Sequence, residues 1–498
     1  MATYKEFLNQ FGLKENPFAS FTTENEGLRF AKTFVKPNDY ETILESFSQK
    51  NSILLTGDRG TGKTALIKDL ISKLNNENSI VSHIIDFSQL KIDYQLQDFY
   101  KFVITNLSMT LFTALADKSK RISRLNREEK LILCYLLKNF ITQISKRQLR
   151  EQIEKVQISN FTRGYKKIEN FIRSIFNYGA TTGGAFIDDY IAKHFSGLPP
   201  LSEYVKIKDY FPELPVDVDE EFIDLDTTYS LMLRIGSLAK RLGFERILLV
   251  FDRVDEDARF INDAEVISEF IVKILIDNKF LLEEDLQVIF STWLTPFNFI
   301  KDQVRTQKHY CPKLSWTTMD LINALNQRLM AYSDSNVTNY KALFAEEVSD
   351  EEMIQVFKLA NSNPRDLWHI FNALLKAQFD LNSSSNKIES GAIPVALTHF
   401  VTSFNYYEYY PKKSNARANT MDIYSYTKHL LKLDSEFFTK NQLKEKAQIG
   451  GSINNYVVGM ERIGLIGRDN QKAGNVYYKI KDQKVIFALK NELQIKLD

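Results

Sequence analysis

The stretch that decides the fold reads SILLTGDRGTGKTALIKDLI and spans residues 52–71. It opens with the apolar run 53–55, passes through a glycine-rich turn, and continues with apolar residues at helical spacing. The turn, Gly57 to Thr64, fits the pattern G-x-x-x-x-G-K-[ST]. Glycines permit positive φ and close backbone approach, so successive N–H groups can point at phosphate oxygens. A buried strand, a phosphate-binding loop and a helix are therefore predicted in this order; the alternative is a turn that binds nothing.

The residues of this turn are candidates for contact with a nucleotide. They are Gly57, Asp58, Arg59, Gly60, Thr61, Gly62, Lys63, Thr64 and Ala65. Lys63 would reach the β- and γ-phosphates, and the Thr64 hydroxyl would ligate Mg²⁺. The helix that starts here would add its positive end. ATP with Mg²⁺ is thus the predicted ligand.

An acidic partner for the magnesium is predicted at the end of a second strand. The run 247–251 in RILLVFDRVDED is continuously apolar, as in a strand buried on both faces, and Asp252 follows it. Its carboxylate would emerge where ligands bind in parallel sheets. Asp255 and Glu256 come within one further turn, and either could orient or deprotonate an attacking water. The alternative for these two acids is a solvated acidic turn.

Two later segments offer further contacts to a phosphate. The apolar run 286–293 contains Ser291 and Thr292, whose hydroxyls could face a γ-phosphate or only cap the strand end. Pro364 suits the first turn of a helix. Arg365 would project from that helix start, where its guanidinium could meet a phosphate or stay solvated.

These motifs, in this order, resemble those of the AAA+ and STAND ATPases, most closely the prokaryotic type related to the ORC/CDC initiators. GDRGTGKT resembles Walker A, ILLVFDRVDE Walker B, VIFSTW the sensor 1 strand, and NSNPRDL the sensor 2 helix. The leader FGLKENPF is similar to the N-terminal segment of such proteins, and by that analogy residues 16–40 would help to enclose the adenine. The resemblance implies an α/β P-loop NTPase with a parallel sheet, a helical lid and a C-terminal winged helix. Arg365 would report γ-phosphate occupancy.

The chain departs from the initiator pattern after Asp252. Initiators carry Glu at the next position, where this chain has Arg253. The acids here come three and four residues after Asp252, an arrangement that resembles STAND and KAP-type ATPases. Slow hydrolysis is therefore expected. Arg305 and Arg328 are candidates for an arginine finger that acts across a subunit interface, or are ordinary solvated or locally paired charges. The alternative function is a regulatory subunit that holds nucleotide without hydrolysing it, in a bacterial defence system by resemblance to STAND proteins.

Composition and spacing divide the chain into segments. We expect a leader at 1–50, an ATPase core at 51–116 and 225–315, a mostly helical insertion at 117–224, a helical lid at 316–385, a linker at 386–424 and a winged helix at 425–498. Roughly 155 residues separate the strand expected at 79–90 from the Asp252 strand, far more than a crossover needs. The insertion is a structural elaboration or a partner-binding element. The stretch 404–420 mixes aromatic and basic residues, which could stack on bases or only pack.

The C-terminal region has a modest basic excess. Residues 431–498 hold twelve Lys or Arg and eight Asp or Glu, a net of +4 in a chain of formal net charge +1. Helix, helix and two short strands follow in winged-helix order, which favours DNA contact through the second helix and the wing. Candidates are Lys440, Lys444, Asn454, Asn455, Arg462, Arg468 and Lys472. The alternative is a surface that binds protein.

Other classes of protein fit the composition poorly. Apolar content of 44% and charged content of 26% are those of a soluble globular chain. Cys134 and Cys311 are too few for a disulfide framework and fit a reducing cytosol. No apolar run reaches the roughly 18 residues of a membrane helix, and the N-terminus lacks a signal-peptide layout. We expect a cytoplasmic protein that associates with itself or with a partner protein.

Overall fold

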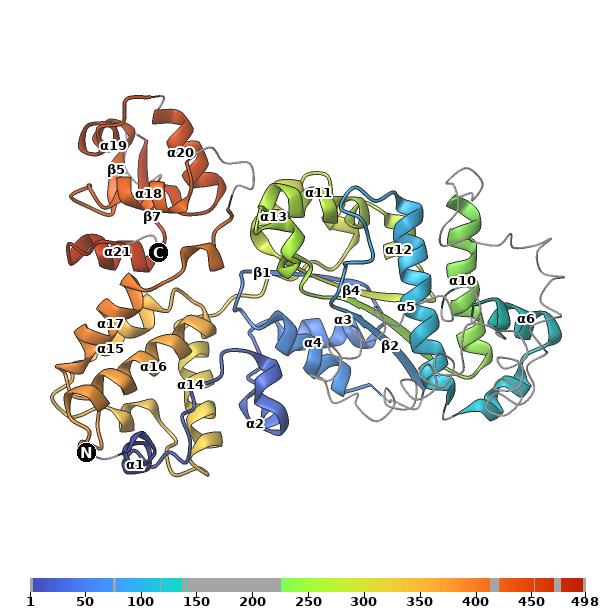
Figure 1. Ribbon diagram of the computed structural model, residues 1–498, viewed down its shortest axis with the longest axis horizontal. Helices are drawn as coiled ribbons and strands as arrows, with labels where there is room; N and C mark the ends of the chain where they lie inside the picture. Colours follow the sequence, from blue (N-terminus) through green and yellow to red (C-terminus); the bar gives the residue numbers. More distant parts are fainter. Residues whose placement is uncertain are drawn as a thin grey trace, which may run out of the picture.

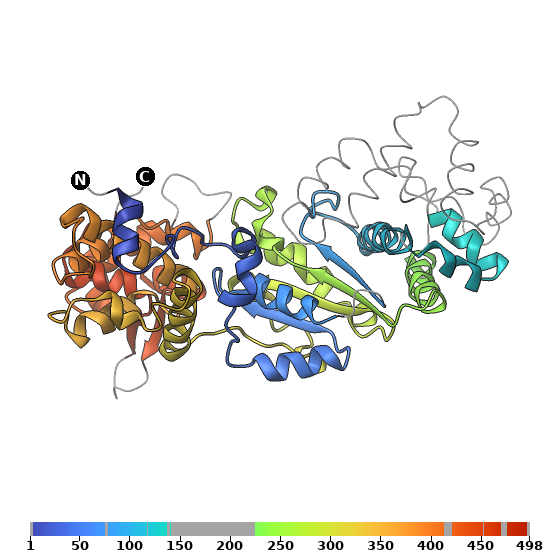
Figure 2. The ribbon, with the colours of Figure 1, turned by 90° about the horizontal axis from the view of Figure 1, so that it is seen from below.

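The computed structural model describes residues 3–74, 78–116, 118–136, 140, 225–412, 421–451, 453–469 and 476–495. A parallel sheet with its helices occupies the centre of Figure 1, with a helical block beside it and a C-terminal unit against that block. Figure 2 shows the N-terminal segment running from the helical block toward the sheet. Among the described residues, none of the helices combines the length and apolar character needed to cross a membrane.

The central sheet has four parallel strands in the order β1-β4-β3-β2. They are β1 (Ile53–Gly57), β2 (Ser79–Ile84), β3 (Arg246–Phe251) and β4 (Gln287–Trp293). All four were predicted, although β2 ends six residues earlier than the expected 79–90. Ile289 of β4 lies opposite Ile53 on one side and Val250 on the other, so β4 separates the two strands that carry the loop and Asp252. The carboxyl ends of β1, β3 and β4 therefore meet at one edge.

A further segment, residues 310–314, runs along the outer side of β1. The Leu54 amide donates to the Tyr310 carbonyl at 2.9 Å, and the Leu314 amide donates to the Thr56 carbonyl at 2.8 Å. These bridges are parallel, like the rest of the sheet. The segment was not predicted from the sequence, and it brings the chain back to the loop before the helices that follow residue 317 begin.

Helices cover both faces of the sheet. One face packs against α3 (Tyr40–Ser48) and α4 (Lys63–Ser72). The other packs against α5 (Leu96–Ala116), α10 (Leu225–Arg241), α11 (Ala264–Leu275), α12 (Asn278–Leu281) and α13 (Leu294–Ile300). Leu248 and Val250 face the first layer, and Leu249 and Phe251 face the second. This alternation explains why the β3 run is apolar throughout.

The helical block forms around one apolar cluster. Its helices are α14 (Thr318–Tyr332), α15 (Asp350–Leu359), α16 (Pro364–Leu381) and α17 (Ala392–Thr402). Thr317 and Ser349 begin α14 and α15 with capping boxes, which satisfy the first free amides. Helix α17 lies inside the range expected as a linker and packs on α16. Phe7 and Leu8 of α1 (Tyr4–Gln10) join the same cluster, so the N-terminus belongs to this block.

The C-terminal unit contains helices around a three-stranded sheet ordered β5-β7-β6. Its elements are α18 (Ile423–Leu430), β5 (Phe437–Thr439), α19 (Lys440–Ala447), α20 (Ile453–Arg462), β6 (Ile466–Asp469), β7 (Tyr477–Ile480) and α21 (Gln483–Lys490). Thr439 caps α19 as predicted. Helix α21 was not predicted. Its Phe487 and Ala488 are buried in the cluster of the helical block, so this helix joins the two units.

Only the first part of the predicted insertion can be described. It contains a 3-10 turn, Ser119–Arg124, and α6 (Arg127–Leu136). The remainder of 117–224 lies outside the described residues apart from position 140. Lys472 and residues 413–420 lie outside them as well.

Candidate nucleotide-binding site

The loop between β1 and α4 has the backbone shape that its glycines predict. Gly60 and Gly62 have φ values of +83° and +87°, in the left-handed region that favours glycine. A Cβ atom on Gly60 would also lie 2.6 Å from Asn363 Oδ1 and 2.9 Å from Arg365 Cβ. Helix α4 starts at Lys63, so its positive end faces the loop. The loop thus has a cradle for an anion, covered on one side by the start of α16.

Thr64 and Asp252 meet at the edge of the sheet. Thr64 Oγ1 donates to Asp252 Oδ2 at 2.9 Å, and Asp252 is 1% exposed directly after β3. Burial disfavours the charged carboxylate, but the nearby His83 imidazole, 3.7 Å away, and the Ser291 and Thr64 hydroxyls outweigh it and lower the pKa of Asp252. The structure therefore brings together the two residues that were predicted to share a magnesium ion.

The Lys63 side chain lies within the loop itself. Its Nζ donates to the carbonyl of Gly57 at 2.9 Å and to the carbonyl of Asp58 at 3.0 Å. Burial lowers the pKa of Lys63, and the nearby carboxylates of Asp255 and Asp252 oppose that effect. A cation held this way is placed beside the amides that would receive a phosphate.

Arg59 of the loop forms an ion pair with Asp255. Arg59 Nε donates to Asp255 Oδ2 at 2.7 Å, and its guanidinium lies 4.2 Å from the centre of the Trp293 ring. Asp255 is buried, so its carboxylate is fixed by this pairing. Glu256 also lines the cavity, its carboxylate makes no hydrogen bond to the described residues, and partial burial raises its pKa. Sequence reasoning missed the pair because the two residues are 196 positions apart.

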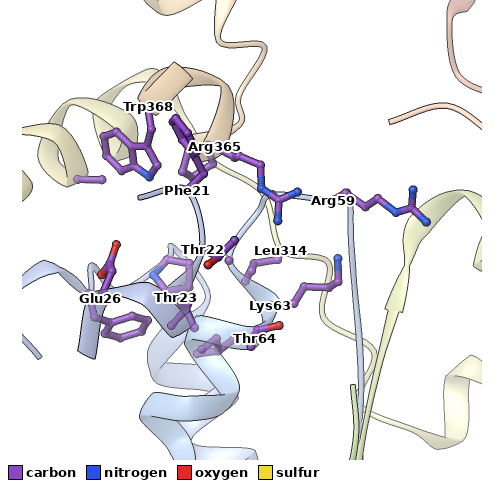
Figure 3. A pocket seen from close by; sticks show the side chains of 18 of the residues that line it. Phe21, Thr22, Thr23, Glu26, Arg59, Lys63, Thr64, Leu314, Arg365 and Trp368 are labelled. Carbon is purple, nitrogen blue, oxygen red and sulfur yellow. The ribbon is translucent and has the colours of Figure 1, made fainter. Parts of the chain in front are cut away.

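Arg365 enters the site from the first turn of α16, as predicted (Figure 3). Its Nε is buried without a hydrogen-bond partner in the part of the chain that is described. Asn363 caps α16 through the Arg365 amide and donates its Nδ2 to the Arg59 carbonyl at 2.7 Å. The helical block therefore contacts the loop directly, and an arginine with unused hydrogen-bonding capacity faces the cavity.

Ser291 and Thr292 end β4 beside these groups. Both side chains are buried. The Ser291 hydroxyl makes no hydrogen bond of normal length to the described residues, although it is close enough to help lower the pKa of Asp252. The Thr292 hydroxyl donates only to the Trp293 carbonyl, at 3.4 Å. Of the two, Ser291 has the capacity for a further partner.

A cavity opens between the loop, the N-terminal segment and the helical block. It holds about 1260 Å³ of empty space including its mouth. Representative lining residues are Phe21, Thr23, Phe34, Lys63, Trp316 and Arg365. Figure 3 shows Phe21 and Arg365 near each other at the top of the view, with Thr22 and Thr23 below them and Lys63 at the lower right. Part of the range 16–40, predicted by analogy to enclose a base, thus lines the cavity.

Of the interpretations left open for Arg328, the structure favours a locally paired charge over an arginine finger. It is 2% exposed, its Nε donates to the Pro17 carbonyl, and it forms an ion pair with Glu26. A side chain buried in this way cannot reach across a subunit interface. The N-terminal segment covers the face of α14 that carries Arg328. Arg305 is exposed and remains a candidate.

Comparison with known families agrees with this geometry. A family model described as the P-loop containing dynein motor region matches residues 24–121, which include β1, the loop, α4, β2 and α5. No curated protein matches the chain. The match, the parallel sheet and the loop together indicate a P-loop NTPase and support nucleotide binding.

Proposed function

We propose that the chain is an ATP-binding switch protein of the AAA+/STAND type. The observation that carries this proposal is the Thr64 hydroxyl, 2.9 Å from the Asp252 carboxylate beside the phosphate-binding loop. Hydroxyl and carboxylate oxygens are ligands that Mg²⁺ prefers, so Thr64 and Asp252 would hold the metal. When bound, the metal neutralises phosphate charge. Lys63 and Arg365 would hold the terminal phosphates from opposite sides.

We further propose that the C-terminal unit is a winged helix that acts on DNA or on a partner protein. The order of α19, α20, β6 and β7 supports this. Arg462 of α20 pairs with Glu265 of α11 and lies 4.1 Å from the Phe299 ring centre. Arg468 pairs with Glu461. Lys440 Nζ also donates to Asn454 Oδ1 at 2.9 Å. Four of the predicted DNA contacts are therefore engaged within the chain, and DNA binding through them would require these interactions to open.

A second candidate is a regulatory subunit that holds nucleotide with little hydrolysis. Two observations favour it. Asp255 is fixed by Arg59, and Arg253 follows Asp252 where initiators carry a catalytic acid. Glu256 is then the acid best able to orient a water, because its carboxylate has no competing hydrogen bond in the described chain. Stable nucleotide occupancy without turnover would support this candidate.

Loss of the Asp252 carboxylate should weaken the magnesium-dependent part of ATP binding. We expect Asp252→Asn to lower ATP affinity in Mg²⁺ by about tenfold, or about 1.4 kcal/mol, because an amide oxygen is a weaker ligand for the metal. Affinity without Mg²⁺ should change much less. Calorimetric titration with and without the metal measures both. Wild-type protein that ignores adenine nucleotides at millimolar concentration would contradict the proposed function.

The two acids after Asp252 should differ in their effect on turnover. We expect Glu256→Gln to slow steady-state phosphate release by about a hundredfold, the usual contribution of a general base. Asp255→Asn should act mainly by breaking the ion pair with Arg59, and its effect on the rate of phosphate release should be smaller. Both variants are compared with wild type, with and without DNA. If neither substitution slows a measurable wild-type rate, the assignment of the catalytic acids is wrong.

A further inference from the structure

Glu408 places an acidic side chain close to Arg365. Glu408 ends the short 3-10 turn Tyr406–Glu408. We call residues 406–412 the connecting segment, because they lie between the helical block and the C-terminal unit. Glu408 Oε2 is 3.9 Å from Arg365 Nη1, and the Glu408 carbonyl accepts from Arg59 Nη1 at 3.4 Å. Glu408 therefore contacts both arginines that flank the candidate phosphate site.

The connecting segment is fixed to the ATPase core by Asn262. Asn262 Nδ2 donates to the carbonyls of Tyr407 and Tyr410, at 2.6 and 3.1 Å. The Lys412 amide donates to the Asn262 carbonyl at 3.0 Å, and Asn262 Oδ1 accepts from Arg59 Nη1 at 2.6 Å. One asparagine thus links the phosphate-binding loop to the connecting segment.

The same segment is fixed from its other side by buried charges. The Tyr409 hydroxyl donates to Asp366 Oδ1 at 2.7 Å, and the Tyr410 hydroxyl donates to Asp482 Oδ2 at 2.8 Å. Lys484 lies between these two carboxylates, with Nζ 2.9 Å from Asp366 and 3.7 Å from Asp482. Because the backbone around Glu408 is held on both sides, its carboxylate stays near Arg365 at little entropic cost.

We propose that Glu408 determines how strongly the site prefers a nucleoside triphosphate over a diphosphate. This inference rests on the proposed nucleotide function. Arg365 lines the cavity and its Nη1 lies 3.9 Å from Glu408 Oε2, so a γ-phosphate in the cavity and the Glu408 carboxylate are alternative anionic partners for its guanidinium. A diphosphate carries no γ-phosphate and leaves the pair intact. Glu408 therefore weakens triphosphate binding selectively, and by linkage a bound triphosphate loosens the connecting segment.

The first test is a titration of the full chain with Mg²⁺-ADP and with a non-hydrolysable Mg²⁺-ATP analogue. Glu408→Gln should raise affinity for the ATP analogue about threefold, as expected for a partly exposed ion pair, and leave ADP affinity unchanged. Glu347→Gln is the matched control, because it removes the same charge from the exposed turn before α15. It should change neither affinity. In an Arg365→Gln background, Glu408→Gln should have no further effect on the ratio of the two affinities.

The second test follows the connecting segment by hydrogen exchange. The amides of Tyr410 and Lys412 donate to the Tyr406 and Asn262 carbonyls, which protects both amides from exchange. The ATP analogue should speed their exchange in wild type, and ADP should not. An unchanged affinity ratio in Glu408→Gln, or an equal rise for both nucleotides, would overturn the role of Glu408. Wild type that binds neither nucleotide would instead overturn the proposed function.

Discussion

Replacing Lys63 with alanine is expected to reduce ATP affinity by at least about a hundredfold. Lys63 Nζ lies within the loop, 2.9 Å from the Gly57 carbonyl and 3.0 Å from the Asp58 carbonyl, so it can turn to phosphate oxygens without leaving the site. A charge-assisted hydrogen bond contributes about 1.5–3 kcal/mol, and loss of one such bond alone approaches a hundredfold. Titration with a fluorescent ATP analogue measures the change.

The control for this variant is Lys73→Ala. Lys73 follows the same helix, α4, and pairs with Asp69 on the surface. Its loss should leave ATP affinity unchanged and stability within about 0.5 kcal/mol, as for most surface substitutions. Lys63→Ala should stay folded, because the substitution removes a partly buried cation whose hydrogen-bond partners among the described residues are backbone carbonyls. Unchanged ATP affinity in Lys63→Ala would refute the assignment of the loop.

Local sequence patterns predicted the central parts of the site well. The glycines, Lys63 and Thr64 are adjacent in the sequence, and the apolar runs on either side specify a strand and a helix. Asp252 is distant, but an acid at the end of a buried parallel strand can only emerge at the carboxyl edge of the sheet. The contact between Thr64 and Asp252 follows from these two facts.

Contacts between distant segments could not be predicted in the same way. The pairing of Arg59 with Asp255 depends on how the turn after β3 folds, and no local pattern encodes it. Arg328 looked like a surface residue because its helix is amphipathic, yet residues some 300 positions earlier cover it. Residues 310–314 contain Pro312, which argues against a strand interior but is tolerated beside the outer strand. Each of these features is set by tertiary packing.

Replacing Lys484 with methionine is expected to lower the free energy of unfolding by about 3–5 kcal/mol. Lys484 and Asp366 are each 1% exposed, and Asp482 is also buried. The cation holds two carboxylates from different units, one at the start of α16 and one at the cap of α21. Methionine fills a similar volume, but it leaves two buried like charges without a counter-ion. Urea denaturation followed by circular dichroism measures the loss.

Two further variants separate this electrostatic effect from a packing defect. Lys490→Met changes an exposed lysine on the same helix, and we expect a change below about 0.5 kcal/mol. Asp366→Asn in the Lys484→Met background removes one of the stranded charges and should recover part of the lost stability. Equal stability of the single and double variants would mean that packing, not charge, sets the cost.

The C-terminal unit and the helical block should also unfold together. Helix α21 places Phe487 in the cluster of the helical block, so we expect both units to lose structure in one transition in Lys484→Met. Separate transitions for the two units would show that the buried triad does not join them.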